Sequence, residues 1–234
     1  MKSYSNELLS IITQKVSDNE NFSYVRYGDA ELMCMTGTYH GHTKDKHSYS
    51  KELSADLITA FINLCEYDNV YMGRWDRSNH ERLLNNLISK YNIQKQFVSF
   101  HILSSEMDYI NAYQYKFYET IKYSKRKKIF VAHEGLAPML TFLNTDNMVT
   151  IPKINAYDHI QNIKSQCISM YEPNAIYVYC AGMNTKVLID STISEYTDTT
   201  HIDVGSAFEP FFNTGTRSKH VTSEYLQTYY EQLL

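Results

Sequence analysis

The hydrophobic positions of this chain form two kinds of pattern, short β-rich runs and longer helical repeats, which alternate along the sequence. Runs of about five residues rich in Val, Ile, Phe and Tyr are bounded by Gly, Asn, Asp or His, as short buried strands are. The runs that predict strands are residues 22–26, 69–73, 97–101, 128–132, 148–151, 175–180 and 200–204.

Longer segments between these runs repeat their apolar residues every three or four positions, as one face of a helix does. In the first of them, for example, Leu53, Leu57 and Phe61 fall on one face. The segments that predict helices are residues 51–67, 79–91, 106–123, 156–170, 184–195 and 223–234.

Strands that alternate with helices indicate βαβ units, in which right-handed crossovers connect parallel strands. The sequence therefore predicts an α/β fold with one doubly wound, mostly parallel sheet that is covered by helices on both faces. No internal repeat and no linker rich in Pro, Gly or Ser divides the 234 residues, so a single domain over residues 1–234 is expected.

Composition and charge argue against several classes of function. The 22 Lys and Arg residues against 26 Asp and Glu give a net charge of −4, which does not favour a nucleic-acid-binding surface. No apolar run approaches the roughly 20 residues that span a bilayer, and the N-terminus lacks the apolar core of a signal peptide. The four cysteines are scattered, which favours reduced thiols over a disulfide framework or a zinc site. We therefore expect a cytoplasmic protein without a transmembrane segment.

A polar segment, residues 36–50, interrupts the alternation. It contains two glycines and three histidines and is predicted to be a long loop, which in a compact domain is often functional. A role as a lid over a site is expected. The spacing of His40, His42 and His47 is a poor match to a zinc site.

The segment 106–128 combines an aromatic helix with a basic end. Tyr113 and Phe117 lie at helical spacing, which favours a core face or a homodimer interface over a platform for a second substrate. Residues 124–128 (SKRKK) follow, and they are predicted to be a solvated helix end that places cations near the negative end of the helix dipole.

In an open parallel sheet, ligands bind beyond the carboxyl ends of the strands, so the residues that follow each strand are the first candidates for a site. After the first predicted strand, Asp29 and Glu31 stand two positions apart, beside Arg26 and Gly28. Two carboxylates at this spacing can share a divalent cation, and Arg26 can bind phosphate. A plainer interpretation is also open, in which Asp29 caps the next helix and Glu31 lies in its first turn.

Two other strand ends carry similar candidates. After residues 175–180 come Gly182, Asn184 as a helix cap and Lys186 in the first turn, where free backbone N–H groups and an ammonium can bind phosphate. The alternative is an ordinary strand–turn–helix with a lysine facing solvent. In the last strand, Asp203 precedes Gly205. A buried carboxylate there needs a partner such as a metal, a ribose hydroxyl or a lysine, although an Asp before Gly also forms turns.

Together, these segments resemble the GT-D type glycosyltransferases, which are bacterial sugar-transfer enzymes with a Rossmann-like fold. The N-terminal signature of that family is an Arg–aromatic–Gly-Asp-x-Glu segment, which residues 26–31 (RYGDAE) match. Its C-terminal signature is a buried strand, a Gly-containing turn with a basic helix start and an Asp-x-Gly strand end. Residues 181–186 (AGMNTK) and 203–205 (DVG) match these parts. The resemblance spans most of the chain and is poorest in its middle.

The resemblance implies a metal-dependent transferase that uses a nucleotide sugar, expected to be a UDP-sugar such as UDP-glucose, and a glycan or glycoprotein acceptor. Asp29 and Glu31 would then bind the cation, Mn²⁺ or Mg²⁺, and the donor diphosphate. The donor-binding residues expected from the match are Arg26, Gly28, Gly182, Asn184, Lys186, Asp203 and Gly205. Many relatives carry His after the Asp-x-Gly, whereas this chain has Ser206, so the role of that histidine does not transfer.

Sugar transfer also needs a base that takes the proton of the acceptor hydroxyl. Glu209, Asp76 and Glu134 each follow a predicted strand and are candidates, with Glu209 assigned first. Trp75, beside Asp76, can stack on a sugar or a base, or pack in the core.

Two other functions remain open, because one architecture hosts many activities. A non-catalytic nucleotide-binding module would keep the crevice without turnover, although the intact Asp29, Glu31, Lys186 and Asp203 speak against such decay. A Rossmann-type methyltransferase would need a glycine-rich turn after the first strand, where this chain has Gly28 alone.

Overall fold

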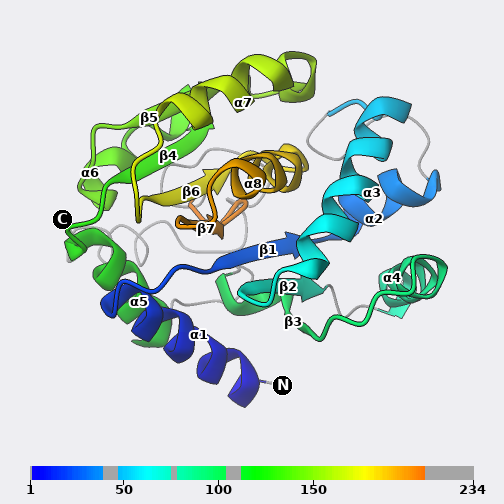
Figure 1. Cartoon of the computed structure of the whole chain (residues 1–234), viewed down its shortest axis with the longest axis horizontal. Helices are drawn as coiled ribbons and strands as arrows, with labels where there is room; N and C mark the ends of the chain where they lie inside the picture. Colours follow the sequence, from blue (N-terminus) through cyan, green and yellow to red (C-terminus); the bar gives the residue numbers. More distant parts are fainter. Residues whose placement is uncertain (1, 39–46, 75–77, 104–111, 209–234) are drawn as a thin grey trace.

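The computed structural model describes residues 2–38, 47–74, 78–103 and 112–208. Its strands form one seven-stranded sheet in the order β3-β2-β1-β7-β6-β4-β5, and every pair of neighbours is parallel (Figure 1). The strands are β1 (Ser23–Tyr27), β2 (Val70–Arg74), β3 (Phe97–Ser99), β4 (Lys128–His133), β5 (Met148–Ile151), β6 (Ile176–Cys180) and β7 (Thr200–Asp203). The predicted α/β fold with a parallel sheet is confirmed.

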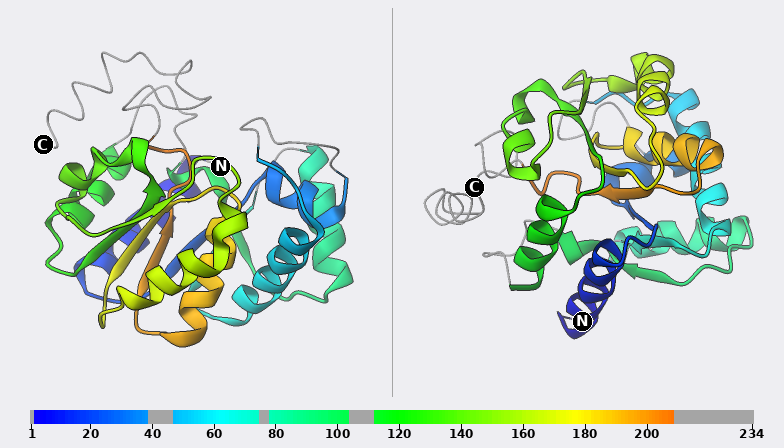
Figure 2. Two further views of the ribbon diagram at one scale, coloured as in Figure 1. Left: turned by 90° about the horizontal axis from the view of Figure 1, so that it is seen from above. Right: turned by 60° about the vertical axis from the view of Figure 1, so that its left-hand side comes forward.

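Helices cover both faces of the sheet, as Figure 2 shows from two sides. The α-helices are α1 (Lys2–Ser17), α2 (Asp29–Thr36), α3 (Lys51–Glu66), α4 (Ser78–Lys90), α5 (Ala112–Tyr123), α6 (Met139–Leu143), α7 (Ile160–Ser169) and α8 (Asn184–Glu195). Three short 3-10 helices are η1 (Phe100–Leu103), η2 (Glu134–Leu136) and η3 (Ala156–His159). Helices α1, α5 and α6 pack on one face, and α2, α3, α4, α7 and α8 pack on the other, so the fold is doubly wound as predicted.

The three central strands, β1, β7 and β6, are buried along their whole length. Successive side chains of a strand point to opposite faces, so Tyr24 enters the core under α1 and α5, whereas Val25 enters the core under α2 and α3. Because both faces are covered, apolar residues of these strands enter the core on both sides, and the polar residues that β1 and β7 also carry, such as Arg26, His201 and Asp203, are buried with them. Burial on both sides holds their carboxyl ends in fixed positions.

Some elements differ from the prediction. Helix α1 was not predicted, although Leu9, Ile12 and Val16 lie three or four residues apart and are buried. The predicted third strand is shorter than expected, because Phe100 leaves the sheet and begins η1. The prediction for residues 223–234 lies outside the described residues.

The basic run after α5 is solvated only in part: Lys125 is exposed, but the prediction is wrong for two other side chains. Arg126 and Lys128 are both buried, and burial lowers the pKa of each. The Nζ of Lys128 donates to the carbonyl oxygens of Lys122 at 3.1 Å and Ser124 at 2.9 Å. Lys128 therefore satisfies carbonyls at the end of α5, as a cation at that position is expected to do.

The aromatic residues of α5 mostly belong to the core. Phe117 and Tyr118 are buried against α6 and the sheet, whereas Tyr113 is 46% exposed. The homodimer stays a prediction. All four cysteines are free thiols, as predicted. None of the helices in the described residues combines the length and the apolar character needed to cross a bilayer.

His201, in β7, is fully buried and sensitive to acid. Its ring nitrogens lie 3.0 Å from the Tyr179 hydroxyl and 2.8 Å from the Thr199 hydroxyl, and burial lowers its pKa to about 3. Below the ordinary histidine pKa of about 6.5, the unfolded chain takes up a proton that the folded protein does not, so the folded state loses stability as pH falls from 6.5 towards 3. We expect a loss of about 2 kcal/mol from this residue at pH 5. Urea denaturation at pH 7 and pH 5 should show a smaller loss in His201→Gln; equal losses would contradict this assignment.

Candidate functional site

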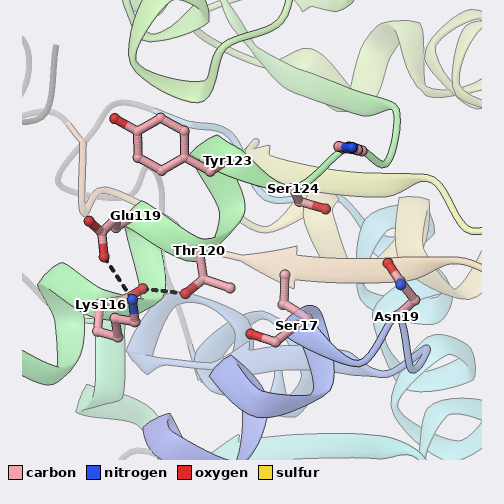
Figure 3. Close-up of a pocket in the computed structure, with 9 residues that line it drawn as sticks. Ser17, Asn19, Lys116, Glu119, Thr120, Tyr123 and Ser124 are labelled. Carbon is pink, nitrogen blue, oxygen red and sulfur yellow. Dashed lines mark hydrogen bonds and ion pairs between the residues drawn. The ribbon is translucent and has the colours of Figure 1, made fainter.

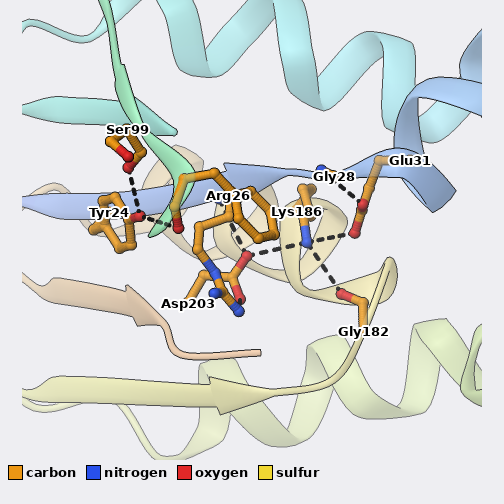
Figure 4. Close-up of polar contacts among 9 residues, drawn as sticks. Tyr24, Arg26, Gly28, Glu31, Ser99, Gly182, Lys186 and Asp203 are labelled. Carbon is orange, nitrogen blue, oxygen red and sulfur yellow. Dashed lines mark hydrogen bonds and ion pairs between the residues drawn. The ribbon is translucent and has the colours of Figure 1, made fainter. Parts of the chain in front are cut away.

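The carboxyl ends of β1, β7 and β6 lie side by side, because β7 is inserted between β1 and β6. Arg26 lies near the end of β1, Asp203 ends β7, and Lys186 lies in the first turn of α8, which follows β6. Three segments that are far apart in the sequence therefore meet at one edge of the sheet, as Figure 4 shows. This is the edge at which the sequence predicts a ligand.

Lys186 is the centre of this site. Its Nζ lies 2.6 Å from Oε1 of Glu31 and 3.0 Å from Oδ2 of Asp203, and it donates to the carbonyl oxygen of Gly182 at 3.3 Å. An ammonium has three N–H donors, so these three acceptors use its whole capacity. Lys186 thereby joins α2, β7 and the β6–α8 turn.

Arg26 is held from several sides. Its backbone N–H donates to Oδ2 of Asp203 at 3.2 Å, and its Nη2 lies 3.7 Å from Oδ1 of the same carboxylate. Its Cζ lies 4.7 Å from the centre of the Phe100 ring, a cation–π distance. Gly205 approaches it closely, since a Cβ built on Gly205 would lie 1.6 Å from Nη2. The guanidinium is therefore fixed in one place.

The four charged side chains form a group without net charge, which we call the charge quartet: Arg26, Glu31, Lys186 and Asp203. Their exposed fractions are 6%, 7%, 3% and 1%, in that order. Burial lowers the pKa of Lys186, but the charges of Asp203 and Glu31 outweigh it, and the net result is a raised pKa. Lys186 is therefore charged at neutral pH. A buried cation is tolerated here because two carboxylates pair with it.

The rim above the quartet is more accessible. Asp29 is half-buried, and its Oδ1 accepts the N–H of Ala30 at 2.9 Å. Gly182 is exposed, has a φ of +56°, and no atom lies within 4 Å of a Cβ built on it. Gly205 and Ser206 are half-buried. A ligand that enters this edge meets these residues first.

The helix ends differ from the plainer interpretation of the sequence. Gly28, not Asp29, is the N-cap of α2, and Oε2 of Glu31 accepts the Gly28 N–H at 3.0 Å. Glu31 therefore satisfies a backbone donor in the manner of a capping box. Asn184 is not a cap either: it is the first residue of α8, and its Nδ2 donates to the carbonyl oxygen of Ala181 at 3.2 Å.

A divalent cation fits the two carboxylates of residues 29–31 only in part. Glu31 has both oxygens engaged, one by Lys186 and one by the Gly28 N–H. Asp29 is free of ion pairs among the described residues and keeps an accessible carboxylate. Nowhere in the described ranges do three or more His, Cys, Asp or Glu side chains gather as metal ligands. A cation here would therefore be held by Asp29 together with atoms of the molecule that binds at this edge.

Other predicted residues lie elsewhere. Glu134 is exposed and begins η2, directly after β4. His47 accepts the backbone N–H of Asn155 at its Nδ1, at 3.2 Å, so this histidine ties the predicted loop to the segment after β5. The candidates that lie outside the described residues are His40, His42, Trp75, Asp76 and Glu209.

Two aromatic residues of the site were missed in the sequence. Phe100 supports Arg26, and it would also touch a Cβ built on Gly28, at 3.2 Å. The Tyr24 hydroxyl lies 3.0 Å from the carbonyl oxygens of both Ser99 and Phe100, which ties the end of β3 to β1 across β2. The available signal was positional, because Phe100 follows a strand as the other site residues do.

A separate cavity of about 520 Å³ lies between α1 and α5 (Figure 3). Its lining includes Ser17 and Asn19, which precede β1, and Ser124, which precedes β4. It is therefore at the amino edge of the sheet, opposite the charge quartet. Its only ion pair between lining residues, among those described, joins Lys116 and Glu119 at 2.9 Å.

Comparison with known proteins is informative about the fold. No family model matches this chain, and no curated protein matches it. One similar solved structure, described as a selenomethionine-substituted structure of domain of unknown function 1792, has a TM-score of 0.60 and 19% identity over 84% of this chain and 76% of its own. Another, described as "the highly conserved domain of unknown function 1792 has a distinct glycosyltransferase fold", has a TM-score of 0.57 and 19% identity over 89% and 83%. The chain thus shares its α/β fold with domains described as having a glycosyltransferase fold.

Proposed function

We propose that this protein is a glycosyltransferase that transfers a sugar, glucose or a related hexose, from a UDP-sugar to a glycan or glycoprotein. One observation carries the proposal. The segments 26–31, 181–186 and 203–205, which match the sequence signature, meet at the carboxyl edge of the sheet in a fold shared with glycosyltransferase-fold domains. That edge is where α/β sheets of this kind bind nucleotides.

The β6–α8 turn is the proposed place for the donor diphosphate. The N-terminus of α8 offers the positive end of a helix dipole, which favours an anion. Gly182 has no side chain, so a phosphate can approach the backbone of the turn closely. Lys186 and Arg26 lie beneath this surface, where they hold the turn and the end of β7 in place.

Transfer requires that charge on the leaving diphosphate be stabilised. A bound divalent cation would add positive charge there, and Asp29 is the residue that would hold it. The acceptor must also be deprotonated, and Glu209 remains the first candidate for that base, with Asp76 and Glu134 as the others. The charge quartet keeps the donor surface rigid, so no reorganisation is needed as the transition state forms.

A thermal-shift panel tests this function. UDP, GDP, CDP, dTDP and S-adenosylmethionine are added to the wild type and to Asp29→Ala, each with and without Mn²⁺. We expect UDP with Mn²⁺ to stabilise the wild type by about 2.7 kcal/mol at a hundred times its Kd, which is about 5–10 °C for a chain of this size. The Asp29→Ala variant should lose the Mn²⁺-dependent part of the shift.

Other outcomes of the panel favour other functions. A shift with S-adenosylmethionine alone would replace the proposal by a methyltransferase. A shift with UDP, combined with no turnover of UDP-glucose in the presence of acceptor glycans, would support a nucleotide-binding module. No shift with any nucleoside diphosphate would contradict a donor site at this edge.

A further inference from the structure

We infer that the two carboxylates of residues 29–31 have separate roles: Asp29 meets the ligand and its cation, whereas Glu31 is a positioning residue that acts through Lys186. This inference rests on the proposed function and specifies how its site is divided. It departs from the expectation that both carboxylates bind the metal.

The first support is the environment of Glu31. It is 7% exposed, and its two oxygens have different partners within the protein: Lys186 at 2.6 Å and the Gly28 N–H at 3.0 Å. A cation that displaced one of these partners would break the ion pair with Lys186 or the backbone bond at the start of α2. Either change would leave a buried polar group without its partner.

The second support is the path from Glu31 to the rim. The Nζ of Lys186 forms an ion pair with Glu31 on one side and donates to the carbonyl oxygen of Gly182 on the other. Without the charge of Glu31, the ammonium is drawn towards Asp203, its remaining anionic partner among the described residues. Its hold on Gly182 then weakens. The exposed turn that is proposed to receive the diphosphate loses its support from below.

The third support is the contrast with Asp29. Asp29 is half-buried at the first position of α2, and its one described side-chain hydrogen bond is local, to the N–H of Ala30. Its carboxylate is not part of the charge quartet. Asp29 can therefore take a cation without disturbing the protein beneath it.

The experiment compares two isosteric variants, Glu31→Gln and Asp29→Asn. The Kd of UDP is measured by calorimetry with Mn²⁺ and again with EDTA, well below the melting temperature of each protein. The metal-dependent gain is the ratio of the two Kd values. We expect Glu31→Gln to weaken UDP binding about tenfold in both conditions and to keep the wild-type ratio, because a supporting residue acts on the site whether or not the metal is present. Asp29→Asn should bind UDP like the wild type in EDTA, and its ratio should fall to about one.

A double variant tests whether Glu31 acts through Lys186. In a Lys186→Met background, the ammonium through which Glu31 acts is absent. Adding Glu31→Gln should then change the Kd of UDP by less than about twofold, since the effects of residues that act as one unit are not additive. If Lys186→Met does not fold, the ratios of the Kd values of Glu31→Gln and Asp29→Asn are sufficient to test the inference.

Three outcomes would overturn the inference. A ratio that falls in Glu31→Gln as far as in Asp29→Asn would make Glu31 a metal ligand. A lower melting temperature of Glu31→Gln with unchanged Kd values in both conditions would make it a structural residue only. Failure of the wild type to bind UDP in either condition would overturn the proposed function and this division of roles with it, whereas the first two outcomes leave the proposed function intact.

Discussion

Replacing Lys186 with Met is expected to lower the free energy of unfolding by about 3–5 kcal/mol, because the charge quartet then keeps both carboxylates and loses one cation. For a chain of this size, that is a fall in melting temperature of about 6–20 °C. Urea denaturation at neutral pH measures the change. Lys51→Met is the matched control, since Lys51 is exposed at the start of α3 and its replacement should change stability by less than about 0.5 kcal/mol.

The pH dependence of this loss distinguishes charge from packing. A buried carboxylate without its cation has a raised pKa, so the folded Lys186→Met variant binds a proton more readily than its unfolded chain does. The deficit relative to wild type is then largest above the raised pKa and shrinks as pH falls through it. A deficit of equal size at pH 8 and pH 5 would indicate that lost packing of the lysine stem is responsible. Equal stability of Lys186→Met and Lys51→Met would contradict the quartet itself.

The second large effect is expected at Gly205. A Gly205→Ala substitution adds a methyl group 1.6 Å from the Arg26 Nη2, at a residue with a φ of +52°. The backbone conformation alone costs about 1–2 kcal/mol for a residue other than glycine. Arg26 must also leave its position between Phe100 and Asp203, so we expect a total loss of about 3 kcal/mol and a loss of UDP binding.

Gly37→Ala separates the two parts of this effect. Gly37 has a φ of +65°, but no atom lies within 4 Å of a Cβ built on it. The Gly37→Ala variant should therefore lose only the stability that the backbone conformation costs, because no side chain is displaced. Chemical denaturation and UDP titration of the two variants side by side provide the measurement. If Gly205→Ala were no worse than Gly37→Ala and still bound UDP, Arg26 would not be held as described.

The fold, and the meeting of three candidate segments at one edge of the sheet, were predictable from the sequence for the same reason. Short runs rich in β-branched and aromatic residues predict the strands, and apolar residues that recur every three or four positions predict the helices. The order of these elements leads to a parallel sheet with helices on both faces. Once the strands are known, the residues at their carboxyl ends are known as well. Arg26, Lys186 and Asp203 were therefore placed at one edge before their contacts were visible.

The different surroundings of Asp29 and Glu31 were not predictable, because they depend on contacts between distant segments. The spacing of Asp29 and Glu31 fits a metal pair and a helix start equally well. Only the ion pair between Glu31 and Lys186, 155 positions further along, separates the two interpretations. Likewise, Lys186 in the first turn of a helix has no local feature that marks it as 3% exposed. Phe100 was missed because its run of apolar residues was interpreted as continuous strand.

The insertion of β7 between β1 and β6 also has a consequence for how the protein is made. The backbone N–H of Arg26 donates to the carboxylate of Asp203, 177 residues later. Strand β1 therefore lacks one of its two neighbours until β7 has been synthesised. During translation, β1 leaves the ribosome before β7, and one edge of β1 stays unpaired until β7 has emerged as well. A chain that ends after residue 186 but before residue 200 contains two cations of the quartet and one anion, and lacks the strand that joins β1 to β6. The carboxyl edge that carries the charge quartet and the continuous sheet are therefore completed together, once residues 200–203 have been synthesised.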